Sequence, residues 1–169
     1  MEKILARVGL GIVLMAVAIS CSLNSNNEEV EYSAQSELNT LNELLYYLED
    51  DGVDVDTTDL GIYYITLEEG EGMYPETGDT VTLDYTGYYI NGELFDASAL
   101  HSEDGKADFI VGDASMIQGW NDGLKKINKN AKVQLIIPSE FAYGSTGNSS
   151  VPPYQTIIFI IKVYDIKPA

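Results

Sequence analysis

Residue types that usually carry out catalysis are scarce in this chain of 169 residues. The one histidine, His101, lies in a polar stretch beside Ser102 and Glu103, where a surface position is the ordinary expectation. Paired carboxylates such as those at 50–51 and 68–69 fall in turn-like segments. The sequence has no histidine and cysteine cluster with the spacing of a metal site and no glycine-rich phosphate loop. We therefore expect no metal, no cofactor, and a reaction that needs neither a nucleophile nor a strong base.

Aromatic side chains are the residues that could act together. The rings of five of them could converge from strand and turn positions: Tyr85, Phe95, Trp120, Tyr143 and Phe159. An apolar pocket with aromatic walls suits rotation about a prolyl peptide bond, whose barrier is about 18–20 kcal/mol because the planar amide must lose its resonance. The twisted transition state is less charge-separated than the planar ground state, so a water-poor pocket lowers the barrier without cleaving a bond.

A short helix around Trp120 must position this pocket. Apolar residues recur there every three or four positions, namely Ile117, Trp120, Leu124 and Ile127. This spacing predicts one face of a helix of about three turns. Gly119 and Gly123 flank the tryptophan although each glycine costs about 1 kcal/mol in a helix relative to alanine. They indicate that a sheet or a ligand approaches the helix closely.

The remaining elements are expected strands with an apolar period of two. They fall at 62–67, 81–86, 93–96, 109–111, 133–137 and 156–164, with a hairpin signal at Asn91-Gly92. This pattern predicts an α+β fold in which a strongly twisted antiparallel sheet of about five strands wraps around the one short helix. The helix is expected between the third and fourth strands.

An additional amphipathic helix is expected at residues 36–50, ahead of the sheet. Its apolar stripe consists of Leu38, Leu41, Leu45 and Leu48, with Leu44 beside it, and Gly52 ends it. Such a stripe packs on its own domain more often than it forms a dimer, and we expect a monomer. The acidic segment at 52–59 lacks the register of an EF-hand loop, so a solvated turn is expected there.

Several motifs resemble those of one known family, the FKBP-type peptidyl-prolyl isomerases. They occur in the family's order and near its spacing between residues 77 and 167: VTLDYTG at 81–87, NGELFDAS at 91–98, FIVG at 109–112, MIQGWNDGL at 116–124, IPSEFAYG at 137–144, and VPP at 151–153 followed by TIIF at 156–159. The resemblance implies an FKBP-like isomerase domain at 61–169 that acts on proline-containing polypeptides and could bind macrolide-type inhibitors.

The resemblance also implies a role for individual residues. Trp120 would be the floor on which the proline ring rests. The apolar, substrate-binding walls would be Tyr85, Phe95, Met116, Ile117, Val151 and Phe159. The Ile117 backbone N–H and the Tyr143 hydroxyl would donate to substrate carbonyls, and Asp96 would lie beside the amide and orient Tyr85. Asp96, Tyr143, Trp120 and Tyr85 are thus the candidate catalytic residues, whereas Phe109 is expected to be a core residue.

The chain departs from the family pattern at four places. Ala107 stands where an aromatic residue is frequent, the loop at 99–106 is longer than in small members, and no arginine matches the one that often pairs with the motif's aspartate. The turn at 144–150 is one residue short, with Asn148 where a histidine is frequent. These departures concern catalytic rate and inhibitor sensitivity more than the fold.

The N-terminus indicates export. Lys3 and Arg7 precede an apolar run at 8–19, which is shorter than the roughly 20 residues needed to span a bilayer and fits a signal peptide at 1–20. Ala18-Ile19-Ser20 followed by Cys21 resembles the bacterial lipoprotein box, which implies lipidation of Cys21, a flexible tether at 21–35 and an envelope location, most simply the outer membrane. The alternatives are a plain secretory signal and an uncleaved anchor.

The net charge bears on which class of partner the protein could bind. A net charge of −18 repels phosphate backbones, which argues against nucleic-acid binding. The leading hypothesis is a lipid-anchored prolyl isomerase for exported or envelope polypeptides. Its alternative is a non-catalytic peptide-binding or chaperone lipoprotein with the same groove, motivated by Ala107, the missing arginine and the altered 99–106 loop. A structural envelope lipoprotein has only the acidic charge in its favour.

Overall fold

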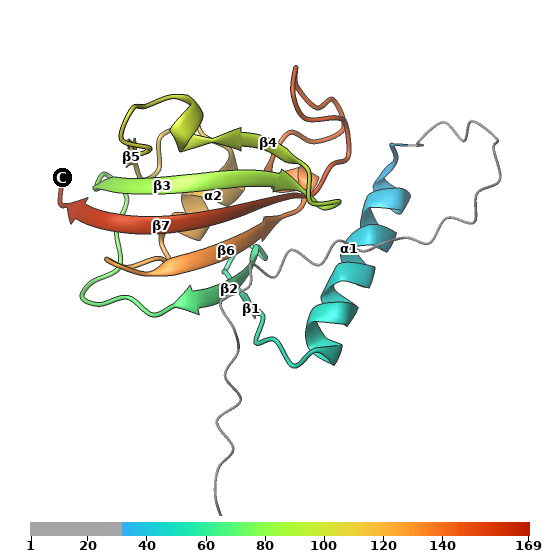
Figure 1. Cartoon of the computed structure of the whole chain (residues 1–169). Coiled ribbons are helices and arrows are strands. Elements are labelled where there is room, and N and C mark those ends of the chain that lie inside the picture. The colour runs from blue at the N-terminus through green and yellow to red at the C-terminus, as the bar shows by residue number, and fades with distance from the viewer. Residues whose placement is uncertain (1–31) are drawn as a thin grey trace, which may run out of the picture.

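The computed structural model describes residues 32–169, so the expected signal peptide, Cys21 and most of the tether lie outside the described residues. The elements in chain order are α1 (Ala34–Asp50), β1 (Asp56–Thr57), β2 (Tyr63–Glu68), β3 (Thr80–Tyr89), β4 (Leu94–Ala97), β5 (Ala107–Ile110), α2 (Gln118–Leu124), β6 (Lys132–Ile137) and β7 (Ile157–Lys167) (Figure 1). Short 3₁₀ turns follow β4 (Ser98–Leu100) and β6 (Ser139–Phe141). Within 32–169, no helix is both long and apolar enough to span a membrane.

The sheet is antiparallel throughout and has seven strands, in the order β1-β2-β6-β7-β3-β4. β5 pairs with the first half of β3, and β4 pairs with its second half, so both lie on the same edge of β3. The α+β class and the antiparallel sheet are confirmed. The sheet has more strands than the expected five or so: all six expected ranges form strands, and β1 adds a two-residue strand inside the segment that was expected to be a turn. α2 follows the fifth strand rather than the third.

One face of the sheet packs against α2, which lies behind the strands in Figure 1. The expected alternation places every second residue of β6 and β7 on this face: Val133, Leu135, Ile137, Ile157, Phe159, Ile161 and Val163. Trp120, Leu124 and Ile127 face them from the helix side, and all three are buried. This cluster is the main core, and one end of it carries the pocket described below.

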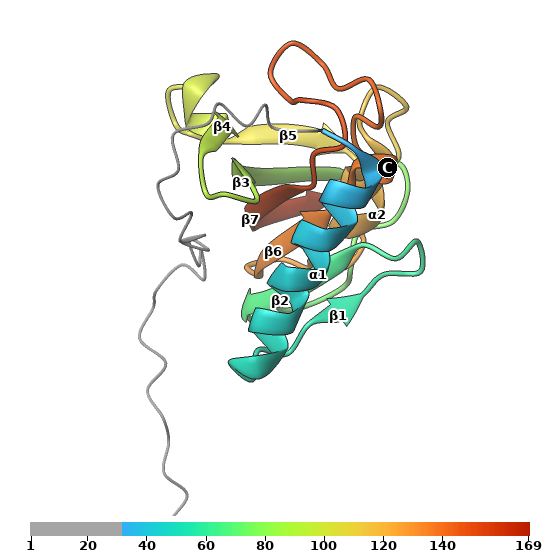
Figure 2. The same cartoon turned by 90° about the vertical axis from the view of Figure 1, so that its right-hand side faces the viewer.

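The opposite face of the sheet packs against α1 near the end of β6 and the start of β7 (Figure 2). Leu41, Leu44 and Leu48 of α1 contact a cluster with Ile136 and Ile158. The helix therefore packs on its own domain, as the sequence favoured. The predicted apolar face of the helix was rotated about the helix axis, however. Leu38 is 49% exposed, and Leu44 is buried in the contact with the sheet.

α2 is shorter than expected. It has 7 residues, Ile117 is its N-cap, and the chain continues after Leu124 through 3₁₀-type bonds from Lys126 N–H to Gly123 and from Ile127 N–H to Leu124. The close approach that the glycines indicated is to the sheet. A Cβ at Gly119 would lie 2.3 Å from the Ile137 Cγ2, and one at Gly123 would lie 2.4 Å from the Leu135 Cδ1. The two glycines thus let α2 lie directly on β6.

Glu37 fastens the start of α1 to the rest of the domain. Its carboxylate accepts hydrogen bonds from the Ser139 backbone N–H (2.7 Å), the Ser139 hydroxyl (2.5 Å) and the Thr156 hydroxyl (2.7 Å). Ser139 is 4% exposed and Thr156 is 1% exposed. The Ser139 carbonyl in turn accepts from the N–H groups of Ala142 and Gly144, so Glu37 holds the segment that carries Tyr143.

Replacing Glu37 with alanine is expected to lower the free energy of unfolding by about 2 kcal/mol, because it leaves buried donors of Ser139 and Thr156 without an acceptor. Urea denaturation followed by tryptophan fluorescence measures the change. Glu43→Ala is the matched control, since Glu43 is an exposed glutamate of the same helix, and it should change stability by less than about 0.5 kcal/mol. Equal losses in the two variants would show that the Glu37 contacts contribute nothing.

Candidate active site

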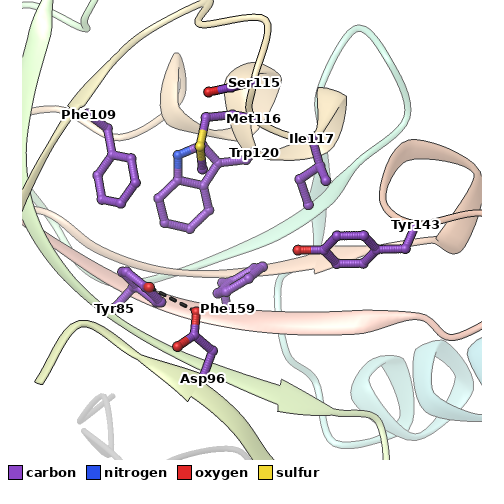
Figure 3. Close-up of a pocket in the computed structure, with 9 residues that line it drawn as sticks. All are labelled: Tyr85, Asp96, Phe109, Ser115, Met116, Ile117, Trp120, Tyr143 and Phe159. Atoms are coloured by element: carbon purple, nitrogen blue, oxygen red, sulfur yellow. Dashed lines mark hydrogen bonds between the residues drawn. The ribbon is translucent and has the colours of Figure 1, made fainter. Parts of the chain in front are cut away.

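A pocket of about 160 Å³ opens where α2 meets the concave face of the sheet. Nine residues line it: Tyr85, Asp96, Phe109, Ser115, Met116, Ile117, Trp120, Tyr143 and Phe159 (Figure 3). They come from β3, β4, β5, the loop before α2, α2 itself, the segment after β6, and β7. The fold thus brings together side chains up to 74 positions apart (from Tyr85 to Phe159).

Trp120 forms the floor of the pocket, and three aromatic rings surround it. The centroid of its ring lies 5.4 Å from that of Tyr85, 5.0 Å from that of Phe109 and 5.0 Å from that of Phe159. The contacts with Tyr85 and Phe159 are edge-to-face, a geometry that aromatic pairs favour. The tryptophan is only 2% exposed, so its ring is fixed by packing and presents little more than one surface to the cavity.

Asp96 places a carboxylate at the edge of this apolar pocket. Its Oδ2 accepts a hydrogen bond from the Tyr85 hydroxyl at 2.9 Å, and its Oδ1 accepts from the Ala97 backbone N–H at 2.8 Å. Burial, and then the hydrogen bond to Asp96, raise the pKa of Tyr85 well above its usual value. The tyrosine therefore stays protonated and acts as a donor, which orients both side chains.

Tyr143 and Ile117 line the pocket on the side opposite Phe109. Figure 3 shows the Tyr143 hydroxyl pointing toward the middle of the cavity. Burial, and then the nearby charge of Asp96, raise the pKa of Tyr143, with a hydrogen bond from Asn148 opposing the shift, so the hydroxyl is a donor at neutral pH. The Ile117 N–H at the N-cap of α2 has no hydrogen-bond partner within residues 32–169, as expected for the first turn of a helix.

Gly87 and Ser98 explain why the strands can hold the rings in this arrangement. A Cβ at Gly87 would lie 2.8 Å from a ring atom of Phe159 and 2.9 Å from one of Phe95, so only glycine admits both rings across β3. The Ser98 hydroxyl, in a residue that is 2% exposed, accepts from the Tyr85 N–H at 3.0 Å and lies 2.6 Å from the Gly105 carbonyl. This contact ties the loop after β4 to β3 beside the pocket.

Most of the residues proposed from the sequence meet in this one pocket. Tyr85, Asp96, Met116, Ile117, Trp120, Tyr143 and Phe159 all line it. Phe95 and Val151 do not. Phe95 stacks on Tyr89 and packs on Phe159 behind the lining, and Val151 is 1% exposed within the core. Their assignment as substrate-binding walls stays a prediction.

Three residues near the pocket were not assigned to it from the sequence. Phe109 was expected to be a core residue, yet it both packs on the core and lines the cavity. Ser115 lies in the loop before α2 and gave no signal in the sequence. His101 was expected at the surface and is indeed 62% exposed, but its Nε2 lies 2.7 Å from the Asp96 Oδ1. The alternation of β5, which puts Phe109 and Ala107 on one face, could have identified Phe109.

No group of three or more histidine, cysteine, aspartate or glutamate side chains within 32–169 is arranged to hold a metal ion. The titratable side chains that line the pocket are Tyr85, Tyr143 and Asp96. The arrangement can bind, orient and desolvate a ligand, and it can donate hydrogen bonds to it.

Comparisons with known proteins give one family. The family model for the FKBP-type peptidyl-prolyl cis-trans isomerase matches residues 72–164. The FKBP-type peptidyl-prolyl cis-trans isomerase FkpA of Escherichia coli is 39% identical over 115 residues, which is 68% of this chain and 41% of that protein. The peptidyl-prolyl cis-trans isomerase FKBP1A of Xenopus laevis is 33% identical over 106 residues, or 62% of this chain and 96% of that protein.

The structural comparison gives the same result. The crystal structure of FkpA from Escherichia coli superposes with a TM-score of 0.66 at 34% identity, covering 80% of this chain and 62% of that one. This chain therefore spans less than half the length of the FkpA sequence it matches, but nearly the whole of the shorter Xenopus protein. From the family match, the relatives and the shared fold, the chain belongs to the FKBP-type peptidyl-prolyl cis-trans isomerase family.

Proposed function

We propose that this protein is a peptidyl-prolyl cis-trans isomerase that assists the folding of exported or envelope polypeptides. One observation carries the proposal: the rings of Tyr85, Trp120 and Phe159 enclose a cavity of about 160 Å³ that has one carboxylate and two protonated hydroxyls at its edge. Prolyl isomerisation limits the folding of many chains to tens of seconds or more. A catalyst that needs neither cofactor nor energy source suits a compartment outside the cytoplasm.

In the proposed mechanism, the residues act by binding and orientation. The proline ring of the substrate rests on the Trp120 indole, and Phe109 and Phe159 exclude water from the amide. The Ile117 N–H and the Tyr143 hydroxyl donate to substrate carbonyls and hold the chain on either side of the rotating bond. Asp96 fixes Tyr85 against the amide. Because the twisted amide is less polar than the planar one, the apolar cavity stabilises it relative to water.

The test of this function is an isomerisation assay with Xaa-Pro peptides. Cis-trans relaxation is followed with the folded protein present and absent, and the proposal expects a rate that increases linearly with protein concentration. A relaxation rate equal to the uncatalysed one, in the presence of protein that circular dichroism shows to be folded, would reject it. A macrolide inhibitor that suppresses the rate would support the assignment of the pocket.

Replacing Tyr143 with phenylalanine is expected to lower kcat/KM by about fivefold. The change removes one hydrogen bond to a neutral acceptor, which contributes about 1 kcal/mol, while the ring keeps its packing. The measurement is the same assay at equal concentrations of folded protein. Tyr154→Phe is a control tyrosine substitution outside the pocket lining and should leave kcat/KM unchanged. If the two variants behave alike, Tyr143 does not bond the substrate.

A non-catalytic peptide-binding or chaperone protein is the alternative function. It is favoured by the small Ala107 side chain, which does not reach the pocket lining and leaves the β5 wall to Phe109. Peptide affinity distinguishes the two functions. A binding module keeps its affinity for Xaa-Pro peptides in Tyr143→Phe and Trp120→Ala and shows no turnover, whereas the isomerase loses affinity and rate together.

We further propose that the protein is exported and anchored to the envelope by a lipid on Cys21, with a signal peptide at 1–20, a tether at 21–35 and a monomeric isomerase domain at 61–169. The support is the sequence around Cys21, since two or three acyl chains hold a protein on a membrane durably. Growth with labelled palmitate should label the protein, and Cys21→Ala should abolish the label. Labelling that persists in this variant would reject the anchor.

A further inference from the structure

The loop after β4 folds back so that His101 meets the carboxylate of Asp96. The His101 Nε2 lies 2.7 Å from the Asp96 Oδ1. The loop is held in place by the 3₁₀ turn at Ser98–Leu100, because the backbone N–H groups of His101 and Ser102 both donate to the Ser98 carbonyl. Ser98 is 2% exposed and is itself tied to β3 through Tyr85. The backbone that carries the His101 imidazole is therefore held in place by this turn and by its link to β3.

The two carboxylate oxygens of Asp96 accept hydrogen bonds on different sides, one toward the pocket and one toward the loop after β4. Oδ2 accepts from the Tyr85 hydroxyl inside the pocket, and Oδ1 is shared by the Ala97 N–H and the imidazole outside it. A change in the hydrogen bonds to Oδ1 therefore alters the position of the whole carboxylate and, with it, the hydrogen bond between Oδ2 and Tyr85. His101 does not itself line the cavity and contacts the lining at Asp96, so it acts on the pocket through this carboxylate.

No other charged group within 32–169 forms an ion pair with His101. On its own loop, Asp104 is engaged by Ser102 and the Lys106 N–H, Lys106 lies over the ring of Tyr164, and Glu103 is exposed. From the pocket side, the tyrosine hydroxyls of Tyr85 and Tyr143 face Asp96 and stay protonated. The imidazole and Asp96 therefore form an isolated pair.

We propose that His101 is a positioning residue for Asp96 and that its contact with this carboxylate raises the rate of prolyl isomerisation. The inference rests on the proposed function. A hydrogen bond to an ionised carboxylate is stronger than one between two neutral groups. The contact from His101 holds the carboxylate where Tyr85 donates to it, so loss of the contact is expected to lower kcat/KM.

The expected effect of His101→Ala is a fall in kcat/KM of about two- to fivefold, the size of one exposed hydrogen bond to a carboxylate. His101→Gln keeps a side chain that can donate a hydrogen bond to Asp96 and should recover part of the loss. The fall should appear in kcat rather than in KM, because His101 does not line the cavity.

The experiment measures cis-trans relaxation of an Xaa-Pro peptide over a range of peptide concentrations at one pH. Leu100→Gln is the matched control, since Leu100 is 67% exposed on the same loop, and it should keep the wild-type kcat and KM. In parallel, NMR follows the ring signals of Tyr85, which should shift in His101→Ala and stay unchanged in Leu100→Gln.

Three results would overturn the inference: a His101→Ala protein with the kcat/KM of the wild type, a loss that Leu100→Gln shows equally, or Tyr85 ring signals that are the same in His101→Ala and the wild type. The NMR result does not depend on turnover, so it tests the contact even if no isomerase activity is found. A wild type that is inactive would instead reject the proposed function.

Discussion

Trp120→Ala is expected to lower kcat/KM for Xaa-Pro peptides by about 50-fold. The indole is the surface on which the three ring methylenes of proline would rest, and burying a methylene contributes about 0.8 kcal/mol, so about 2.4 kcal/mol of binding in the transition state is lost. The same truncation removes edge-to-face contacts with Tyr85 and Phe159 and is expected to lower the free energy of unfolding by about 3–5 kcal/mol. Isomerisation and urea denaturation measure the two effects.

Leu124→Ala separates the catalytic loss from the structural one. Leu124 is fully buried on the same helix and in the same core as Trp120 but does not line the pocket. It should lower stability by about 2–5 kcal/mol and leave kcat/KM per folded molecule unchanged. Trp120→Phe, which keeps a ring on the floor, should fall between wild type and Trp120→Ala. A Trp120→Ala protein that is folded and as active as Leu124→Ala would remove the indole from the mechanism.

The sheet could be predicted from the sequence because burial on one face imposes a period of two. Val133, Leu135 and Ile137 alternate with side chains that face the other way, and the same holds for Ile157, Phe159 and Ile161. Glycines at 119 and 123 predicted a close approach, since they are unfavourable in a helix that does not need the room. Both signals come from the residue types at nearby positions of the chain. They can therefore be recognised without knowing which residues pack against them.

The phase and length of the helices could not be predicted in the same way. Leu38, Leu41, Leu45 and Leu48 have helical spacing, but so do Leu41, Leu44 and Leu48, and only the position of Ile136 and Ile158 decides between them. The spacing of Ile127 likewise continues that of α2, although the chain there has already tightened into 3₁₀-type bonds. A buried side chain at helical spacing does not show whether the backbone at that point forms α-helical or 3₁₀-type hydrogen bonds.

Part of the site depends on loop conformation, which residue spacing leaves open. The family motifs were sufficient to bring seven proposed residues into one pocket. They did not locate His101, because five positions of loop separate it from Asp96 and its approach depends on the turn at Ser98. No arginine of the sequence matches the one that often pairs with the motif's aspartate, and the folded loop places the His101 imidazole against this carboxylate instead.

Asp96→Ala is the second large effect, with an expected loss in kcat/KM of about 30-fold. The substitution removes the acceptor of the Tyr85 hydroxyl, and a hydrogen bond to a charged group contributes about 1.5–3 kcal/mol. Tyr85 would then turn its hydroxyl toward the substrate or water instead of holding its ring against the amide. The loss should appear mainly in kcat, because the carboxylate orients the pocket rather than binding the proline ring, and steady-state kinetics with a range of peptide concentrations measures the split.

Asp96→Asn and Tyr85→Phe resolve how the carboxylate acts. The asparagine keeps an oxygen that can accept from Tyr85 but removes the charge, so we expect a loss of about fivefold if the hydrogen bond is the main contribution. If Asp96 acts only through Tyr85, the double variant Asp96→Ala with Tyr85→Phe should be no worse than the poorer single variant, since coupled residues are not additive. Full additivity would mean that the charge of Asp96 acts on the substrate directly. An Asp96→Ala protein within twofold of wild type would exclude both roles, and with them the basis for any effect of His101 on the rate.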